Sequence, residues 1–237
     1  MISGYRAVLQ APRKLELEPR EFPDPGPGEL LLETEVTLIS TGTELTAYSG
    51  DFPPDSVWSH YIQYPVGIGY SHVGRVVQVG EDVEGYAPGE RVLSMGAHAT
   101  HALSSGKQVW RVPDGVEATD ATFGVLAEIV MGGLRRGRIQ FGESVVIVGA
   151  GLLGQLAAHF CSRIGAWPVV TVDPVPGVRQ ESAARMGAGA VLACTAVEAR
   201  ERVEALTRGR MADVVIEVTG NPHAFPGAVR LARRLGR

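Results

Sequence analysis

The stretch that decides the fold is VVIVGAGLLG at residues 145–154, and a second apolar run that ends on an acid, PVVTVD at 168–173, follows it. The four β-branched residues that open the stretch favour a strand buried on both faces of a parallel sheet. After such a strand, Gly149 permits a sharp turn, Gly151 lets the backbone approach a pyrophosphate, and Gly154 lets the next helix pack tightly. The stretch therefore predicts a strand, a turn and a helix that together bind an adenine dinucleotide.

The context of this glycine motif makes it specific, because a chain with 30 glycines produces G-x-G-x-x-G by chance. Here the motif follows a predicted strand and opens residues 152–163, which have helical composition. The helix dipole and the unpaired amides at the helix start would face the diphosphate. The predicted cofactor-binding residues of this turn are Gly149, Gly151, Leu152, Leu153 and Gly154.

Asp173 predicts which dinucleotide is bound. It lies 19 positions after Gly154 and ends the next predicted strand, Val169–Val172. A carboxylate there accepts hydrogen bonds from the adenosine ribose hydroxyls and repels a 2′-phosphate. Pro174 stands where an arginine or serine would have favoured that phosphate. The prediction is therefore NAD, with NADP less favoured.

Composition restricts the class of protein. The chain has 237 residues, 45% of them hydrophobic, which is enough to bury a large core. A net charge of −4 without basic runs argues against a nucleic-acid or anionic-membrane partner. No stretch reaches the roughly 18 apolar residues of a membrane span, and the first residues lack a signal-peptide core. Cys161 and Cys194 have no metal or redox spacing. We expect a cytoplasmic protein that acts on a small-molecule substrate.

The residue pattern changes near position 115, which predicts two domains, 1–115 and 116–237. Before this point, short alternating runs are separated by Pro and Gly clusters, a pattern of strands and turns that is typical of a compact β-barrel. The predicted strands are Tyr5–Gln10, Lys14–Glu18, Glu29–Leu38, Val73–Val79 and Arg91–Ser94.

After residue 115, a linking helix is predicted over Ala118–Arg136, with Gly132 and Gly133 as its weak point. Strands and helices then alternate, which implies a parallel sheet with right-handed crossovers and the strand order 3-2-1-4. The strands are predicted at 144–148, 169–173, 189–193 and 212–217, and the helices at 152–164, 177–187, 196–208 and 223–235. The predicted fold class is α/β, a barrel followed by an incomplete Rossmann sheet.

Three motifs occur in a fixed order: GRVVQVGEDVEGYAPGERV at 74–92, GAGLLG at 149–154 and ADVVIEVTGNP at 212–222. With them the chain resembles the medium-chain dehydrogenase/reductase superfamily, which contains the zinc-type alcohol dehydrogenases and their zinc-free quinone reductase relatives. STGTEL at 40–45 and GIGYSHVG at 67–74, with GAHATH at 96–101, are most similar to the branch of bacteriochlorophyllide dehydrogenase-like proteins.

The resemblance implies a GroES-like catalytic barrel followed by a Rossmann domain that binds NAD(P). It implies hydride transfer between the nicotinamide and a small organic substrate, which is an alcohol, a carbonyl compound or an activated double bond. The loop after the fourth strand of the sheet contacts the cofactor in this family. The resemblance therefore adds Thr219 to the predicted cofactor-binding residues.

Two departures from the family pattern predict that catalytic zinc is absent. Where zinc members carry Cys-Gly-Thr-Asp and Gly-His-Glu, this chain has Thr41 and Tyr70 at the two ligand positions. A neutral hydroxyl and a phenol are poor ligands for Zn²⁺, which binds thiolate, imidazole and carboxylate. The four cysteines of the structural zinc lobe are also absent. A non-standard metal site remains open as an alternative, because ligand-type side chains surround the expected active site: Glu44, His72, His98, His101 and Glu128.

Without zinc, hydrogen-bond donors must polarise the substrate carbonyl. Thr41 and Tyr70 are the first candidates, and His98 is the candidate proton relay, because its unperturbed pKa lies near neutrality. The alternatives are that Thr41 caps a turn, Tyr70 packs and His98 is structural. His72 is expected to be a hydrogen-bonded core histidine.

The chain ends at Arg237, where the fifth strand of the sheet is expected to begin, whereas family members continue. We expect the fourth strand, Val214–Val218, to be an unpaired apolar edge that favours association with another chain. A homo-oligomer is one outcome. A second function class is therefore a truncated, non-catalytic protein with residual dinucleotide binding.

Overall fold

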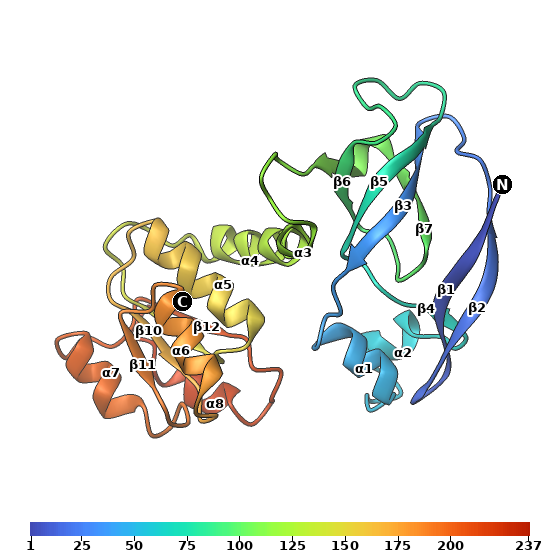
Figure 1. Ribbon diagram of the computed structural model, residues 1–237. Helices are drawn as coiled ribbons and strands as arrows, with labels where there is room; N and C mark the ends of the chain where they lie inside the picture. The colour runs from blue at the N-terminus through green and yellow to red at the C-terminus, as the bar shows by residue number, and fades with distance from the viewer. The chain divides into compact units, whose positions relative to one another are not determined.

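The computed structural model describes residues 1–237 and divides them into two compact units, Met1–Val125 and Leu126–Arg237 (Figure 1). The division falls after residue 125 rather than near residue 115. The reason is that helix α3 (Ala118–Ala121) packs against strands of the first unit. Each unit has its own sheet and its own core.

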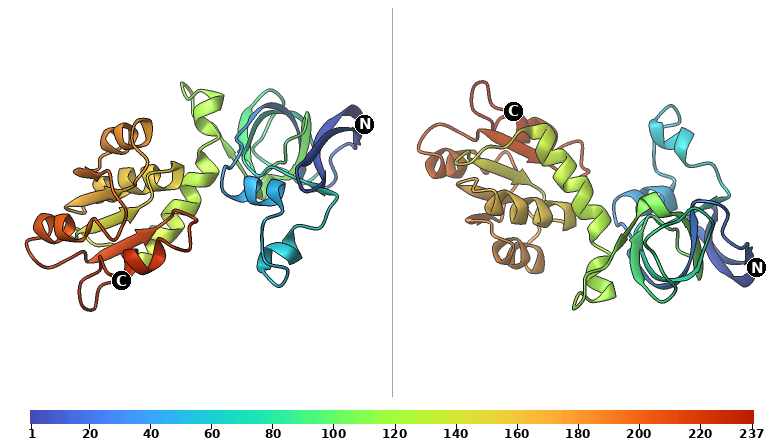
Figure 2. Two further views of the ribbon diagram at one scale, coloured as in Figure 1. Left: turned by 90° about the horizontal axis from the view of Figure 1, so that it is seen from below. Right: turned by 90° about the horizontal axis from the view of Figure 1, so that it is seen from above.

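The first unit is an antiparallel β structure. A five-stranded sheet has the order β7-β3-β5-β6-β8, and a three-stranded sheet has the order β2-β1-β4. In Figure 2 the strands of the larger sheet are seen end-on as a nearly closed ring. Apolar side chains that alternate along the strands fill its interior, Leu30, Leu32, Val76, Val92 and Val109. The strands are β1 Ile2–Ala11, β2 Lys14–Phe22, β3 Glu29–Thr37, β4 Val66–Gly67, β5 His72–Val79, β6 Arg91–Ser94, β7 His101–Ser105 and β8 Val109–Arg111.

The expectation that this region holds only strands and turns is wrong. It also contains helices α1 (Thr43–Ser49) and α2 (Val57–Tyr61) and a short 3-10 turn at Gly106–Gln108. Helix α1 ends at Gly50, which has φ 71° and donates its N–H to the Thr46 carbonyl. A left-handed glycine commonly ends a helix. However, α1 has only seven residues, which is too short for a helical repeat of apolar residues to be recognised in the sequence.

The linking helix differs from the prediction as well. It is interrupted at residues 122–123, where the Ser71 hydroxyl donates to the Thr122 carbonyl, and continues as α4 (Gly124–Gly137). The predicted weak point at two glycines does not interrupt α4. Leu126, Val130 and Leu134 recur every four residues and are buried, so packing along one face holds the helix together.

The second unit is a Rossmann-type α/β sheet. Its four strands are parallel in the order β11-β10-β9-β12, which confirms the predicted order 3-2-1-4. Figure 1 labels β10, β11 and β12 of this sheet. The elements are β9 Val145–Val148, α5 Leu152–Arg163, β10 Val169–Val172, α6 Val178–Arg185, β11 Ala190–Leu192, α7 Arg200–Leu206, β12 Val214–Glu217 and α8 Phe225–Val229.

The central strand β9 is buried on both faces, as its sequence predicts. Ile147 faces α5, because a Cβ at Gly154 of that helix would lie 3.5 Å from its side chain. Val146 and Val148 face the opposite way and share a core with residues of α7 and α8 such as Val203 and Ala228. The crossovers therefore place helices on both faces and reverse the winding direction between β9 and β12.

The last part of the chain corrects three predictions. Helix α8 stops at Val229, so the predicted helix over 223–235 is too long, and α7 is likewise shorter than 196–208. Beyond α8 the chain returns along β12. Val215 donates to the Arg237 carbonyl (2.8 Å) and Arg237 donates to Asp213 (3.1 Å), which is the pattern of a parallel neighbour. The β12 edge is therefore partly paired. No helix in the structure has the length and apolar character needed to cross a membrane.

Candidate functional site

The three glycines of the turn after β9 differ in what a side chain would meet at each position. Gly149 has φ 106°, and a Cβ there would lie 3.2 Å from the Thr219 amide nitrogen. A Cβ at Gly154 would lie only 1.9 Å from the Gly149 carbonyl oxygen, so α5 packs directly on the turn. A Cβ at Gly151 would meet no heavy atom within 4 Å. The turn therefore leaves open space at the position where the sequence predicts that a diphosphate approaches the backbone.

The start of α5 supplies the donors for an anion. Gly151 is the N-cap, and no side chain caps the helix. The Gln155 amide returns to the Gly151 carbonyl, whereas the amides of Leu152 and Leu153 have no partner in the protein. These unpaired N–H groups and the positive end of the helix dipole point away from the helix at its start. The residues present fit a dinucleotide diphosphate.

Asp173 closes the glycine turn from the neighbouring strand. Its Oδ2 accepts the Ala150 amide (2.7 Å) and its Oδ1 accepts the Val175 amide (2.8 Å). The residue is only 4% exposed. The exposed guanidinium of Arg179 lies 3.9 Å from Oδ2. Each carboxylate oxygen keeps a further lone pair, so Asp173 can both hold the turn and accept from a ribose hydroxyl.

Thr219 lies opposite the glycine turn, across the point between β9 and β12 at which the strand order reverses. It follows β12 and contacts Gly149, which follows β9. Its amide donates to Glu217 Oε1 (2.7 Å), and its hydroxyl donates to the same oxygen. The structure therefore brings together the predicted cofactor residues that follow β9 and β12, at the carboxyl edge where ligands of open parallel sheets bind.

The predicted catalytic residues come from three segments of the barrel unit. Thr41 is exposed in the turn before α1, and Tyr70 is half-buried in the segment before β5. His98 lies between β6 and β7, and its amide donates to the Ile68 carbonyl (2.8 Å). Its ring contacts Glu44 of α1. His98 is thus hydrogen-bonded to both segments that carry the other two residues.

The His98 ring is bonded at both nitrogens. Nε2 is 2.6 Å from Glu44 Oε2, and Nδ1 is 2.8 Å from the Thr37 hydroxyl. The second oxygen of Glu44 accepts the Ser40 amide (2.8 Å). The side chains of His98 and Glu44 are 13% and 5% exposed. These hydrogen bonds join the end of β3, helix α1 and the loop between β6 and β7.

His72 is a core histidine, as predicted. It is fully buried, with Nδ1 2.9 Å from the Ser94 hydroxyl and Nε2 2.9 Å from the Thr34 hydroxyl. Burial and the neighbouring His98 lower the pKa of His72 to about 4. His72 therefore stays neutral at physiological pH.

The residues proposed as ligands of a non-standard metal site have separate partners in the structure. The His101 ring lies tilted beside that of Phe22, with ring centroids 5.4 Å apart, and Glu128 is exposed on α4. Glu44 bonds to His98, whereas His72 bonds to hydroxyls. No group of three or more His, Cys, Asp or Glu side chains is placed to hold a metal ion.

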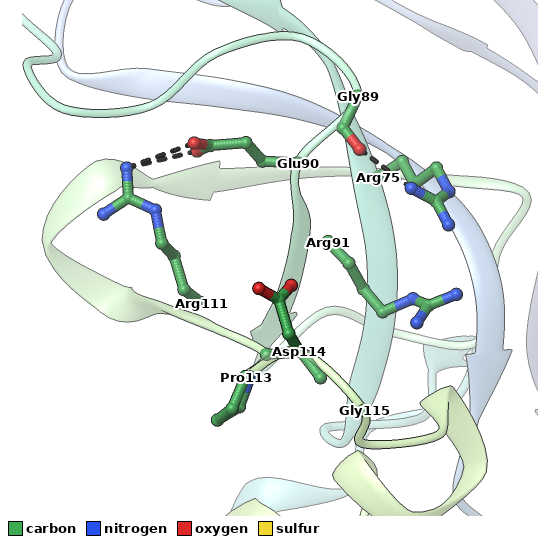
Figure 3. A pocket seen from close by; sticks show the side chains of 9 residues that line it. Arg75, Gly89, Glu90, Arg91, Arg111, Pro113, Asp114 and Gly115 are labelled. Carbon is green, nitrogen blue, oxygen red and sulfur yellow. Dashed lines mark hydrogen bonds and ion pairs between the residues drawn. The ribbon is translucent and has the colours of Figure 1, made fainter.

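A surface hollow of about 380 Å³ lies elsewhere on the barrel unit (Figure 3). None of the predicted site residues lines it. Glu35 pairs with Arg75 (2.5 Å) and Arg91 (2.8 Å), and Arg111 pairs with Glu90 (3.2 Å). Its arginines are therefore neutralised by their own neighbours, and we assign the hollow no ligand. It is lined by Arg75, Gly89, Glu90, Arg91, Arg111, Val112, Pro113, Asp114 and Gly115.

Sequence reasoning missed two residues at these sites. Thr37 ends a strand and gives no signal, because only the folded barrel brings it to His98. Arg179 could have been noticed as the first basic residue after Asp173. Glu44 was noted as a ligand type, but its pairing with a histidine 54 positions away needs the tertiary structure.

Comparison with known proteins identifies the family. The profile of the alcohol dehydrogenase GroES-like domain matches residues 26–136, and that of the zinc-binding dehydrogenases matches residues 153–237. The L-threonine 3-dehydrogenase of Xanthomonas euvesicatoria is 31% identical over 91% of this chain and 70% of its own length. The chain belongs to the medium-chain dehydrogenase/reductase superfamily and is an oxidoreductase of the alcohol dehydrogenase-like type.

Solved structures share the fold. An oxidoreductase of unknown specificity from Escherichia coli matches with a TM-score of 0.85 at 23% identity, over 99% of this chain and 76% of its own. A proposed zinc-binding dehydrogenase from Sinorhizobium meliloti, solved with NADP, matches with a TM-score of 0.82 at 24% identity, over 100% of this chain and 75% of its own. The resemblance to bacteriochlorophyllide dehydrogenase-like proteins stays a prediction.

Proposed function

We propose that this protein is a nicotinamide-dependent dehydrogenase or reductase that acts on a small organic substrate without catalytic zinc. The observation that carries the proposal is the glycine turn, with open space at Gly151 and two unpaired amides at the start of α5. When bound, the dinucleotide supplies or accepts the hydride. Gly149, Gly151, Leu152, Leu153, Gly154, Asp173 and Thr219 would hold it.

The barrel unit supplies the groups that act on the substrate oxygen. Thr41 and Tyr70 are hydroxyl donors for the charge that develops on a carbonyl during reduction. The hydroxyl of Thr41 is available, because the N-cap of α1 is Gly42 and no side chain caps that helix. His98 is the proton relay of the proposed reaction, next to both segments.

The proposed absence of zinc is supported by donor chemistry. Thr41 and Tyr70 carry neutral oxygens, whereas Zn²⁺ in proteins takes thiolate, imidazole or carboxylate ligands. His98 and Glu44 are committed to each other, and both nitrogens of His72 are bonded to hydroxyls. Metal analysis of dialysed protein tests the point, and one zinc per chain contradicts it.

A preference for NAD is part of the proposal, and it is supported by the charge of Asp173. A buried carboxylate at the end of β10 repels a 2′-phosphate, whereas Arg179, on the exposed side, partly offsets that repulsion. In Asp173→Asn the charge disappears and the side chain keeps its size, although the new NH2 group cannot accept one of the two amides, Ala150 or Val175, that the carboxylate accepts. We expect the ratio of NADPH to NADH affinity to rise about tenfold, which corresponds to about 1.4 kcal/mol.

Fluorescence titration with NADH and NADPH measures that ratio, and Asp51→Asn, which removes an exposed acid of the other unit, is the control. An unchanged ratio in Asp173→Asn contradicts the role of this carboxylate.

The proposed activity is tested by a turnover assay with purified protein. NADH and NADPH are each tried with a panel of aldehydes, ketones and enones. Turnover that Thr41→Val and Tyr70→Phe lower at unchanged dinucleotide affinity supports the proposal. Dinucleotide binding without turnover on any substrate favours the non-catalytic alternative. The predicted partners, a small molecule and no nucleic acid or membrane, agree with the net charge of −4, and light scattering tests for a homo-oligomer.

A further inference from the structure

The peptide bond between Ala150 and Gly151 lies in the middle of the glycine turn, and a side chain holds its carbonyl. Gln155 Nε2 donates to the Ala150 carbonyl oxygen (2.9 Å). A carbonyl oxygen only accepts, so the NH2 group of Gln155, and not its oxygen, is the group that faces it. Ala150 is fully buried, and no backbone amide donates to the same oxygen. The carbonyl therefore depends on Gln155 for its hydrogen bond.

The preceding peptide bond is held in a different way. Asp173 Oδ2 accepts the Ala150 amide (2.7 Å). The Gly149 carbonyl lies against Gly154 of α5, where a Cβ would be 1.9 Å from its oxygen. Ala150 has a glycine on each side, so the backbone by itself permits more than one orientation of these two peptides. Asp173 selects the orientation of the first peptide, and Gln155 selects that of the second.

The orientation that Gln155 selects directs an amide into the open space of the turn. In a trans peptide the C=O and the N–H point in opposite directions, so a carbonyl that faces α5 places the Gly151 N–H on the other side. That N–H has no partner in the protein, and a Cβ at Gly151 would meet no heavy atom within 4 Å. The Gly151 amide therefore precedes the unpaired amides of Leu152 and Leu153, and successive free amides form an anion-binding surface.

If this peptide turned over, the charges at the turn would be reversed. The Ala150 carbonyl would face the proposed place of the diphosphate and repel the phosphate oxygens, whereas the Gly151 amide would face α5. Gly151 permits this change, because glycine adopts φ of either sign. Gln155 opposes it, because its NH2 group would lose an acceptor and face a second donor.

We propose that Gln155 is a positioning residue of the dinucleotide site, which keeps the Gly151 amide directed at the diphosphate. The proposal rests on the proposed function, which places the diphosphate at this turn. Because of Gln155, the turn has its anion-binding conformation before the cofactor arrives. Such preorganisation raises affinity, since binding does not have to supply the free energy that reorients the peptide.

The first test needs no cofactor. In NMR of the ligand-free whole protein, the three-bond couplings between the amide and α protons of Gly151 report its φ, which is −68°. Gln155→Met keeps a similar side-chain length and helix propensity but has no donor. We expect its Gly151 couplings to change, because φ changes sign when the peptide turns over. Gln140→Met, at an exposed glutamine of the same unit, is the control. Unchanged Gly151 couplings in Gln155→Met overturn the proposal.

The second test separates positioning from a general disturbance of the fold. NADH affinity is measured by fluorescence titration, and the affinities for ADP and adenosine are measured by NMR titration. Gln155→Met should bind NADH and ADP about 10-fold more weakly, because a charge-assisted hydrogen bond to the diphosphate is weakened. Adenosine, which has no diphosphate, should bind as it does to the wild type. Gln140→Met should leave all three affinities unchanged.

Two results of the second test overturn the proposal. Unchanged ADP affinity in Gln155→Met would mean that the peptide orientation does not matter for the diphosphate. Equal losses for ADP and adenosine would mean that the substitution disturbs the whole site. If the wild type binds neither NADH nor ADP, the proposed function fails, and the Gly151 couplings still decide whether Gln155 holds the peptide.

Discussion

Gly151→Ala separates folding from dinucleotide binding. The backbone at Gly151 has φ −68° and ψ −173°, which any residue adopts, and a Cβ there meets no atom within 4 Å. Alanine gains about 0.4–1 kcal/mol from the unfolded state, but it is a poorer N-cap than glycine by a similar amount. We therefore expect the free energy of unfolding to change by less than about 1 kcal/mol.

Binding should change far more, because the new methyl group occupies the open space that the diphosphate is proposed to fill. Moving the diphosphate away weakens its charge-assisted bonds to the Leu152 and Leu153 amides, each of which contributes about 1.5–3 kcal/mol. We expect NADH and NADPH to bind about 10- to 100-fold more weakly.

Two measurements on the same protein check this prediction: NADH fluorescence titration for affinity, and urea unfolding followed by circular dichroism for stability. Unchanged NADH affinity in a folded Gly151→Ala variant refutes the reasoning, because the open space would then not be the diphosphate site. Equal losses of affinity and stability refute it too, because the methyl group would then disturb the fold.

Gly154→Ala should lower both the dinucleotide affinity and the free energy of unfolding. The new Cβ would lie 1.9 Å from the Gly149 carbonyl oxygen, so α5 must move by about 1 Å or more. We expect a cost of about 1–3 kcal/mol, which urea unfolding measures. Asp213→Asn should lower stability by about 2 kcal/mol at pH 7. Burial alone would raise the pKa of Asp213, but hydrogen bonds from Ser144 and Arg233 lower it to about 2 from 3.8. The stabilisation is therefore complete above pH 4 and is lost as the pH falls through 2. Denaturation at pH 7 and pH 2 checks this, and a constant difference between wild type and variant contradicts it.

Much of the second unit could be predicted from sequence because its signals are local. The β-branched run of β9, the three glycines and Asp173 lie within thirty positions, and the spacing of a strand, turn and helix fixes their arrangement. The alternation of strands and helices, with the handedness of crossovers, then fixes the strand order 3-2-1-4. The end of α8 differs from the prediction, because the chain that follows it pairs with β12 instead of continuing as a helix.

The sequence by itself determined the barrel, the Rossmann order, the dinucleotide turn and the replacement of the zinc ligands by Thr41 and Tyr70. The first three follow from residue types at fixed spacing, whereas the predicted replacement of the zinc ligands follows from the resemblance to the family. Only the tertiary structure decided that His72 is buried between two hydroxyl groups whereas His98 joins Glu44 and Thr37. The physical reason is that hydrogen bonds between side chains far apart in sequence depend on strand pairing and loop closure. Antiparallel strands β3, β5 and β6 bring those residues to one corner, and no local pattern records that meeting.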